Sequence, residues 1–209
     1  MLFRSKTTPA AASRIIEKDF ADYRDWYRLN WGNPHWWSAQ TRKIKDPAYT
    51  GPDGAKLTLD VKIAKDATLF FVVRDNGWNA FPKQTNGEYY ARVNIKGSAK
   101  WQSVGVTVAD FKPVDQRTKH PLKSWRRITE LGIRGRIAVM LDGKKTELPA
   151  KPTNWTKPRA LRNLRWEGGQ YTQGANTPDA GKTMTQTERK KQFQKAIDDS
   201  IKLEKRDEK

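Results

Sequence analysis

The middle of this chain alternates between apolar and polar residues with a period of two, a pattern typical of β-structure. Side chains of a β-strand point alternately to opposite faces, so a strand with one buried face has an apolar residue at every second position. Residues 56–63 (KLTLDVKI), 88–96 (EYYARVNIK) and 100–111 (KWQSVGVTVADF) follow this rule. The positions expected to face the interior are Leu57, Leu59, Val61 and Ile63, then Tyr89, Ala91, Val93 and Ile95, and finally Val104, Val106 and Val108.

Residues 68–75 (TLFFVVRD) are apolar at nearly every position, which predicts a central strand covered on both faces. Further strands are expected at residues 136–141 and 161–167, and Asp142-Gly143 marks a turn after the first of them. Short strands separated by turn signals, with no helices between them, indicate an antiparallel sandwich or barrel. We therefore expect an all-β fold, built as an antiparallel β-sandwich.

Helical patterns occur only in short or terminal segments. Residues 15–26 fit either a helix or a strand, and Ser124 could cap a short helical turn. Thr185 and Glu188 have the spacing of a capping box, and an apolar stripe with a spacing of four residues follows them. The expected organisation is a flexible N-terminal segment at residues 1–14, a β-sandwich domain at 15–169, a linker at 170–184 and a charged C-terminal helix at 185–209.

The charge balance is strongly basic. The chain has 41 Lys and Arg residues against 23 Asp and Glu, a formal net charge of +18. Residues 112–127 and the stretch between Glu147 and Glu167 are especially rich in basic side chains. Such a field attracts polyanions: nucleic acid, an anionic membrane surface, or a sulfated or uronic polysaccharide. A cationic surface without a specific partner is the alternative interpretation. No apolar run approaches the roughly 20 residues that a membrane-spanning helix needs.

Catalytic motifs are scarce in this sequence. There is no cysteine, and His35 and His120 do not occur in a zinc-binding spacing. No Gly-x-Ser-x-Gly nucleophile motif is present. Nothing in the sequence pairs the carboxylates of the expected strands as glycoside hydrolysis requires, so we do not expect an enzyme. These carboxylates belong to Asp60, Asp75, Glu88 and Asp110.

A structural calcium ion is the metal for which the sequence offers possible ligands. Asp19, Asp22 and Asp53 could supply carboxylate oxygens, but no calcium-loop motif accompanies them. The sequence therefore predicts no cofactor with certainty and leaves the metal question open.

Nine tryptophans stand out, and their sequence contexts suggest two roles. Trp101, Trp166 and Phe111 begin or end patterned strands, so we expect them in the core. Trp31, Trp36 and Trp78 lie in segments rich in Asn, Gly and Pro, where a flat ring beside amide groups is typical of a sugar-binding platform. Trp36 and Trp37 are adjacent, so we expect one to be a platform and the other to be core.

Aromatic rings provide a large contact area for the C–H face of a pyranose, and amides and guanidinium groups bind its hydroxyls. Affinities of millimolar to micromolar, about −4 to −8 kcal/mol, are expected of such a site. Further polar groups could come from Asn30, Asn33, Gln40 and Gln84. The candidate ligand-binding residues are Trp31, Trp36, Trp37, Arg74, Asn76, Trp78, Asn79, Tyr90 and Arg92.

The motif KWQSVGVTVADF, followed by Trp125, Ile128 and Leu131-Gly132-Ile133 and closed by LRNLRW, resembles carbohydrate-binding modules of the galactose-binding-domain-like jelly-roll superfamily. The resemblance covers roughly residues 15–170 and is greatest to modules appended to secreted bacterial polysaccharide-degrading enzymes. It implies a jelly-roll sandwich, a non-catalytic polysaccharide-binding role and a secreted or periplasmic location. Many such modules are near neutral or acidic, so the charge of +18 favours an anionic polysaccharide, with Arg74, Lys83 and Arg92 as charge partners.

Two other functions fit the same sequence. The motif also occurs in the domain of mitochondrial complex I assembly factors, which implies a scaffold or assembly subunit that binds another protein. Basic residues interleaved with aromatic residues also suit an RNA-binding subunit, in which rings stack on bases and lysines contact phosphates. Nucleic acid is the weaker of these interpretations, because no RNP, KH or zinc-knuckle motif is present.

Overall fold

The computed structural model describes residues 13–20, 26–30, 37–46, 48–75, 87–118, 120–155 and 160–169. The chain divides into two units, Met1–Gln173 and Gly174–Lys209, and all the described residues belong to the first. The linker and the C-terminal helix expected after residue 169 lie outside the described residues, as do residues 1–12 of the flexible segment expected at 1–14, whose last residue, Arg14, begins a strand. Among the described residues, no helix is both long and apolar enough to span a membrane.

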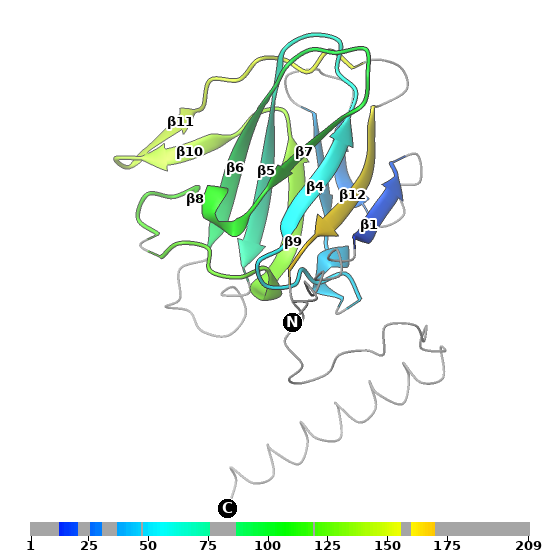
Figure 1. Cartoon of the computed structure of the whole chain (residues 1–209). Helices are drawn as coiled ribbons and strands as arrows, with labels where there is room; N and C mark the ends of the chain where they lie inside the picture. Colours follow the sequence, from blue (N-terminus) through cyan, green and yellow to red (C-terminus); the bar gives the residue numbers. More distant parts are fainter. Residues whose placement is uncertain are drawn as a thin grey trace, which may run out of the picture. The chain divides into compact units, whose positions relative to one another are not determined.

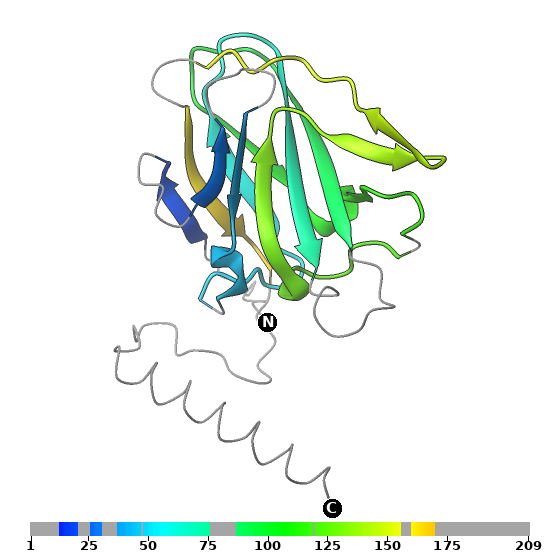
Figure 2. The ribbon, with the colours of Figure 1, turned by 180° about the vertical axis from the view of Figure 1, so that it is seen from behind.

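Two antiparallel sheets, of four and six strands, pack face to face, and a two-stranded hairpin forms a third sheet among the described residues (Figures 1 and 2). The four-stranded sheet has the order β1-β12-β4-β7, and the six-stranded sheet has the order β2-β3-β9-β5-β6-β8. The four-stranded sheet consists of β1 (Arg14–Asp19), β12 (Leu161–Glu167), β4 (Lys56–Val61) and β7 (Gln102–Val106). The six-stranded sheet consists of β2 (Trp26–Asn30), β3 (Ser38–Thr41), β9 (Ile128–Arg134), β5 (Ala67–Asp75), β6 (Glu88–Ile95) and β8 (Lys112–Pro113).

The alternating segments form strands, as the sequence predicts. On β4, Leu57, Leu59 and Val61 are fully buried between the sheets. On β6, the expected inner face is Tyr89, Ala91 and Ile95 together with the partly buried Val93. The expected central strand, β5, lies between β9 and β6 and is buried along seven of its nine positions. These findings confirm an all-β, antiparallel sandwich.

Large aromatic rings fill the core between the sheets. Trp125 lies 4.9 Å from Trp166 and 5.5 Å from Phe111, measured between ring centroids. The Trp125 indole N–H donates to the Ala55 carbonyl at 2.8 Å, so this buried polar group is satisfied. Phe111 and Trp166 are therefore core residues, as expected. The same expectation for Trp101 is wrong, because 38% of that residue is exposed.

A two-residue turn joins β10 (Ala138–Leu141) to β11 (Lys144–Glu147). Asp142 and Gly143 have φ values of +48° and +76°. Positive φ at both central positions is what a type I′ hairpin turn requires, and Asp-Gly is a favoured sequence for it. The turn predicted at Asp142-Gly143 is confirmed.

Several elements were not evident from the sequence pattern. The ambiguous segment at residues 15–26 contributes a strand, β1. Strands β3 and β9 were not among the expected strands, although Leu131 and Ile133 of β9 face the core and alternate with Glu130 and Gly132 on the outer face. Ser124 caps the short 3-10 helix Trp125–Arg127 as predicted, and its hydroxyl accepts from the Arg126 N–H at 3.1 Å.

Candidate functional site

The outer face of the six-stranded sheet brings three of the predicted binding residues together. Arg74 lies near the end of β5, and Tyr90 and Arg92 lie on β6. Val73 and Tyr89, their chain neighbours, are buried in the core between the sheets. Because side chains alternate along a strand, Arg74, Tyr90 and Arg92 point to the other side, away from that core.

Trp37 is not available as a binding residue, which corrects the prediction that included it. It is 1% exposed, and its ring packs edge-on against Trp155 with centroids 4.9 Å apart. Of the adjacent pair Trp36 and Trp37, the second therefore has the core role. The remaining predicted residues lie outside the described part of the chain: Trp31, Trp36, Asn76, Trp78 and Asn79.

The strands that flank these undescribed segments end at different places on the sheet. Asn30 pairs with Ser38, and the register through β9 places Ser38 level with Phe70 of β5. Asp75, at the other end of β5, donates its N–H to the Gly87 carbonyl at 3.0 Å. The ends of β2 and β3 that flank residues 31–36 thus lie toward one end of β5. The ends of β5 and β6 that flank residues 76–86 lie at its other end, and the outer face of the six-stranded sheet lies between them.

Alternating charges form a row across this face. Arg74 of β5 is directly opposite Glu88 on β6 and Glu130 on β9. Arg42 follows directly after β3 on the other side of β9, and its guanidinium also lies near Glu130. We call Arg42, Glu130, Arg74 and Glu88 the charged row. Directly opposed residues on neighbouring strands have Cβ atoms about 5 Å apart, so these side chains meet.

The groups of the charged row lie within ion-pair distance but beyond strong hydrogen bonding. Arg74 Nη1 is 3.8 Å from Glu130 Oε1, and Arg74 Nη2 is 3.6 Å from Glu88 Oε2. Arg42 Nε is 3.8 Å from Glu130 Oε2. A charge-assisted N–H···O⁻ bond is typically about 2.7–2.9 Å long. Within the described residues, the Glu130 carboxylate therefore has neighbouring positive charge but no hydrogen bond, although its side chain is only 8% exposed.

Beside the charged row, Gly132 of β9 leaves a position on the outer face without a side chain, and we call this position the gap. The register places Gly132 between Gln40 of β3 and Val72 of β5, and Tyr90 follows next to Val72. Gln40 is 3% exposed, and no described residue hydrogen-bonds to its Oε1. A buried amide oxygen without a hydrogen-bond donor lowers stability by about 1–3 kcal/mol, so a ligand group that donates to Gln40 Oε1 would be favoured here.

Arg134 connects this gap to the charged row. Its Nη2 lies 3.4 Å from Glu88 Oε1, although Glu88 stands on β6 and Arg134 on β9. A Cβ built on Gly132 would be 3.7 Å from Arg134 Nε and 3.3 Å from the Gln40 Cγ. The absence of a side chain at Gly132 therefore leaves space for the Arg134 and Gln40 side chains.

Apolar residues occupy the rest of the face. Phe70 and Val72 of β5 point outward but are 0% and 2% exposed. They form a second small core with Ile137, against which the partly buried Tyr90, Val114, Leu148 and Ala150 pack. The Tyr90 and Phe70 rings are 6.4 Å apart and tilted. Tyr90 is thus anchored on one side, and Arg92 is exposed at the next outward position of β6.

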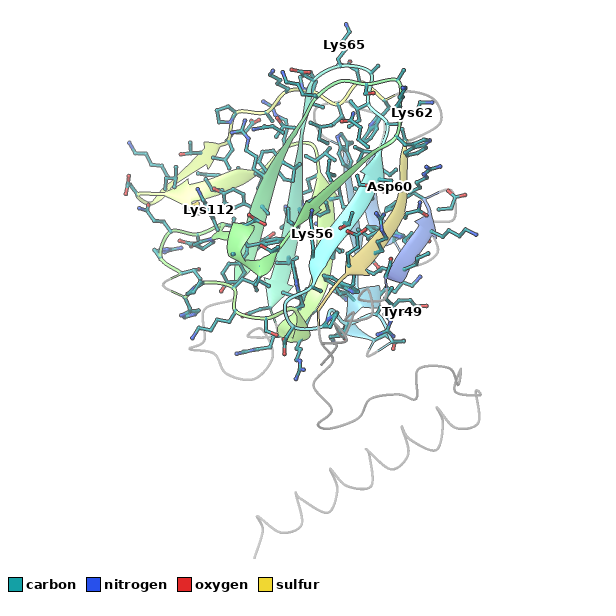
Figure 3. All side chains as sticks on the ribbon, viewed as in Figure 1. Tyr49, Lys56, Asp60, Lys62, Lys65 and Lys112 are labelled. Carbon is teal, nitrogen blue, oxygen red and sulfur yellow. The ribbon has the colours of Figure 1, made fainter. Side chains whose placement is uncertain are left out.

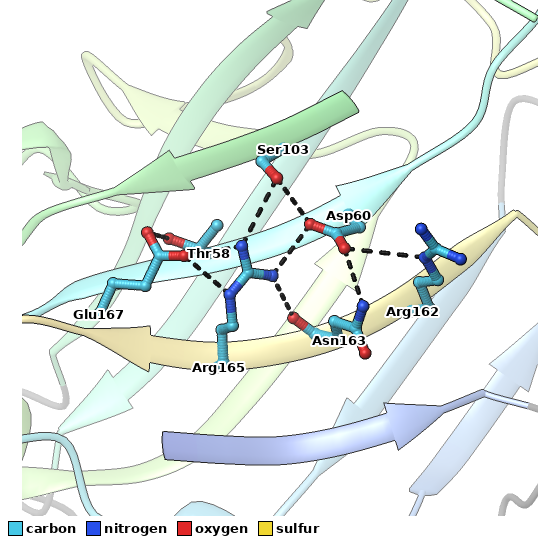
Figure 4. Close-up of polar contacts among 7 residues, drawn as sticks. All are labelled: Thr58, Asp60, Ser103, Arg162, Asn163, Arg165 and Glu167. Atoms are coloured by element: carbon cyan, nitrogen blue, oxygen red, sulfur yellow. Dashed lines mark hydrogen bonds and ion pairs between the residues drawn. The ribbon is translucent and has the colours of Figure 1, made fainter. Parts of the chain in front are cut away.

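The outer face of the four-stranded sheet has a different polar network, centred on Asp60 (Figure 4). Arg165 Nη1 donates to Asp60 Oδ1 at 2.9 Å, and the Ser103 hydroxyl donates to the same oxygen at 2.7 Å. Asn163 Nδ2 donates to Asp60 Oδ2 at 2.9 Å. Arg165 also donates to Glu167 at 2.7 Å. These bonds join β4, β7 and β12.

Asp60 and Glu130 therefore differ in hydrogen bonding, although both are largely buried. Burial raises the pKa of Asp60, but the hydrogen bonds from Asn163, Ser103 and Arg165 outweigh it, and the pKa is lowered overall. A carboxylate so fully bonded cross-links the strands and has little capacity for a ligand. Glu130, in contrast, has hydrogen-bonding capacity that the described residues leave unused.

A metal site is not evident in the part of the chain that the structure describes, where no three His, Cys, Asp or Glu side chains gather. Of the possible calcium ligands, Asp53 instead contacts Arg126 at 3.1 Å and accepts from the Ser124 hydroxyl at 2.9 Å. Asp22 lies outside the described residues.

The sequence interpretation named part of this site. It included Arg74, Tyr90, Arg92 and Gln40, but it missed Glu130 and Arg134 and treated Glu88 as unpaired. The available signal was weak: Glu130 is the charged residue within the otherwise uncharged stretch ITELGI. Its pairing with Arg74 depends on β9 lying beside β5, although the two residues are far apart in the sequence.

No protein-family model matches the chain, and no curated protein matches it. Among solved structures, the chain is similar to a family 11 carbohydrate-binding module from Clostridium thermocellum in complex with a β-1,3-1,4-mixed-linked tetrasaccharide. The TM-score is 0.40 and the sequence identity is 12%, over 77% of this chain and 98% of that chain. The fold and the site described above rest on the contacts of this chain alone.

Proposed function

We propose that this chain binds carbohydrate without catalysing a reaction, and that the outer face of the six-stranded sheet is its binding surface. The observation that carries this proposal is the charged row. Within it, Arg74 and Glu130 meet each other at 3.8 Å, and Arg74 meets Glu88 at 3.6 Å, so Arg74 and Glu130 retain hydrogen-bonding capacity for the hydroxyl groups of a ligand. Sugar hydroxyls both donate and accept, and the alternating row offers both kinds of partner.

The residues beside the charged row complete such a surface. The unpartnered Oε1 of Gln40 accepts a further hydroxyl in this proposal, if the Arg134 side chain moves aside. Tyr90 is anchored on Phe70 and provides an aromatic edge with little loss of conformational entropy. Arg92, exposed on the same face, extends it toward an anionic substituent. A secreted or periplasmic location belongs to the same proposal.

The substitution Glu130→Gln tests this proposal, because it keeps the shape of the side chain and removes its charge. A hydrogen bond to a charged group contributes about 1.5–3 kcal/mol, so we expect affinity for the bound polysaccharide to fall roughly tenfold or more. Binding is measured by affinity electrophoresis and calorimetry against mixed-linkage β-glucan, xylan, galactan and polygalacturonate.

The matched control is Glu147→Gln, which removes a carboxylate that pairs with Arg136 on the β10–β11 hairpin. This variant should bind like the unmodified chain. Thermal unfolding of each variant separates a loss of binding from a loss of fold, and Arg74→Gln provides a second change in the charged row. The proposal is wrong if the unmodified chain binds none of the four glycans, or if folded Glu130→Gln and Arg74→Gln bind as well as Glu147→Gln.

A further inference from the structure

One end of the sandwich brings together three segments that are distant in sequence. Segment 62–66 joins β4 to β5, and segment 96–101 joins β6 to β7. Lys151 lies on the third segment, which follows β11. The Ser98 N–H donates to the Ile63 carbonyl at 2.7 Å. The Thr68 N–H donates to the Lys151 carbonyl at 3.0 Å, which brings the third segment to the start of β5. The three segments therefore form one continuous surface.

The Asp66 carboxylate holds these segments together. It accepts from the Gly97 N–H at 3.0 Å, from Lys96 Nζ at 3.0 Å and from Lys151 Nζ at 3.3 Å. The Gly97 N–H, and after it the Lys96 and Lys151 ammonium groups, lower the pKa of Asp66, so its carboxylate is ionised at neutral pH. Asp66 thus fixes the positions of two lysines whose side chains are 89% and 65% exposed.

Positive charge exceeds negative charge on this surface. Lys65, Lys96 and Lys100 are exposed, and Lys62 is half-buried. Figure 3 shows Lys62 and Lys65 near the same end of the sandwich, apart from Lys56 and Lys112. On the three segments, Asp66 is the one acidic side chain among the described residues. We call Lys62, Lys65, Lys96, Lys100 and Lys151 the lysine end.

An exposed aromatic ring borders the lysine end. Trp101 directly precedes β7 and is 38% exposed. The guanidinium carbon of Arg162 lies 4.0 Å from the centre of the Trp101 ring, a cation–π contact. Arg162 is in turn 3.7 Å from Asp60, so the stacked guanidinium is held by the strand network. The neighbouring Gln102 side chain donates to the Lys96 carbonyl at 2.8 Å, which ties the start of β7 to the lysine end.

We propose that the lysine end, together with Trp101 and Arg162, binds a sulfated or carboxylated polysaccharide. The lysines and Arg162 attract sulfate or carboxylate groups, and the exposed part of the Trp101 ring contacts the apolar face of a sugar. This surface is distinct from the charged row, so the proposal does not depend on the function assigned to that row.

The structure favours such a glycan over single-stranded nucleic acid as the polyanion. Proteins that bind single strands generally stack successive bases on several aromatic rings. Among the described residues of this surface, Trp101 is the one exposed aromatic ring, and Arg162 already occupies part of it. Distributed lysines with a single ring fit a chain that carries its charges at the periphery of its sugar units.

The test compares two double variants of the full chain with equal loss of charge. Lys65→Gln with Lys100→Gln removes two charges from the lysine end, and Lys144→Gln with Lys145→Gln removes two from the exposed strand β11. The probes are heparin, polygalacturonate, neutral mixed-linkage β-glucan and poly-U RNA, each titrated at several NaCl concentrations. Because two ionic contacts are lost, we expect the first variant to bind heparin or polygalacturonate about tenfold more weakly at 0.1 M salt, with a shallower salt dependence.

The second variant should keep the affinity of the unmodified chain within about twofold, since it changes charge elsewhere. Trp101→Ala should weaken binding of the same glycan, and a melting curve confirms that this exposed residue is not needed for the fold. Equal losses in both double variants would reduce the effect to net charge and overturn the proposal, as would tighter binding of poly-U than of either glycan. The proposal is also overturned if the unmodified chain binds neither heparin nor polygalacturonate. It is equally overturned if Glu130→Gln weakens binding of these glycans and the variants of the lysine end do not, because the ligand then belongs to the charged row.

Discussion

At the scale of single residues, the role of each buried carboxylate depends on how many hydrogen-bond donors surround it. Asp60 accepts from Arg165, Ser103 and Asn163 at 2.7–2.9 Å. Glu130 is equally enclosed but meets guanidinium groups only at 3.8 Å. A fully bonded buried charge contributes to stability, whereas one with unused capacity is a more natural ligand contact. Two buried carboxylates therefore have different roles on the two sheets.

We expect Asp60→Asn to destabilise the fold by about 1–3 kcal/mol at pH 7, because Arg165 loses one of its two charged partners. Since the folded pKa of Asp60 is lowered, its contribution is present above the unfolded pKa of about 4 and is lost as the pH falls through the lowered value. The variant should therefore lose less stability than the unmodified chain between pH 5 and acidic pH. Urea unfolding across this range measures both effects, and equal stability of the two proteins at pH 7 would contradict the expectation.

At the scale of elements, β5 is covered on both faces because a later segment crosses its outer side. Phe70 and Val72 point away from the main core, yet Ile137 and the residues that pack with it exclude them from water. The Leu148 N–H donates to the Ile137 carbonyl at 3.0 Å, which fixes this covering segment. The continuous apolar run of β5 is thus explained by two different layers.

We expect Ile137→Ala to lower the free energy of unfolding by about 2–4 kcal/mol, since Ile137 is 4% exposed and its truncation leaves a cavity over Phe70. The matched change Leu141→Ala, at the end of the adjoining strand β10 but 41% exposed, should cost about 0.5 kcal/mol or less. Chemical unfolding of both variants measures the difference. Similar costs for the two substitutions would show that the covering segment does not exclude water from β5.

At the scale of the whole molecule, the net charge of +18 destabilises the compact state as well as attracting anionic ligands. Like charges repel in the compact state, and salt screens this repulsion over a Debye length of about 10 Å at 0.1 M. The few acidic residues are used to offset it locally, as Asp66 does between Lys96 and Lys151.

We therefore expect the unfolding temperature to rise by a few degrees when NaCl is increased from about 20 mM to about 300 mM, because screening of the excess positive charge outweighs the weakening of exposed ion pairs. Differential scanning fluorimetry checks the direction. Addition of heparin at low salt should raise the unfolding temperature further if the lysine end binds it, by the usual linkage of binding to stability. A fall in unfolding temperature with salt would mean that attractive pairs dominate.

Much of the fold could be predicted from the sequence alone. Alternation and the continuous run at residues 68–75 identified β4, β5, β6 and β7, because the period of a strand is a property of the local backbone. The turn at Asp142-Gly143 was evident for the same reason, since positive φ is a local preference. The site could be predicted only in part. Arg74, Tyr90 and Arg92 were named and share a face, but the residues that pair with Arg74 on neighbouring strands could not be inferred.

Only the tertiary structure decided which tryptophan is buried and which carboxylate has a partner. Trp37 lies in the core, a choice that the sequence left open between Trp36 and Trp37, and Trp101 is exposed although its place at the start of a patterned strand favoured the core. The pairing of Arg74 with Glu130 and of Asp60 with Arg165 depends on which strands are neighbours. Strand order joins residues that are distant along the chain, and a period of two carries no information about that order. The physical reason is that periodicity reports one strand's own geometry, whereas a binding surface is made by several strands together.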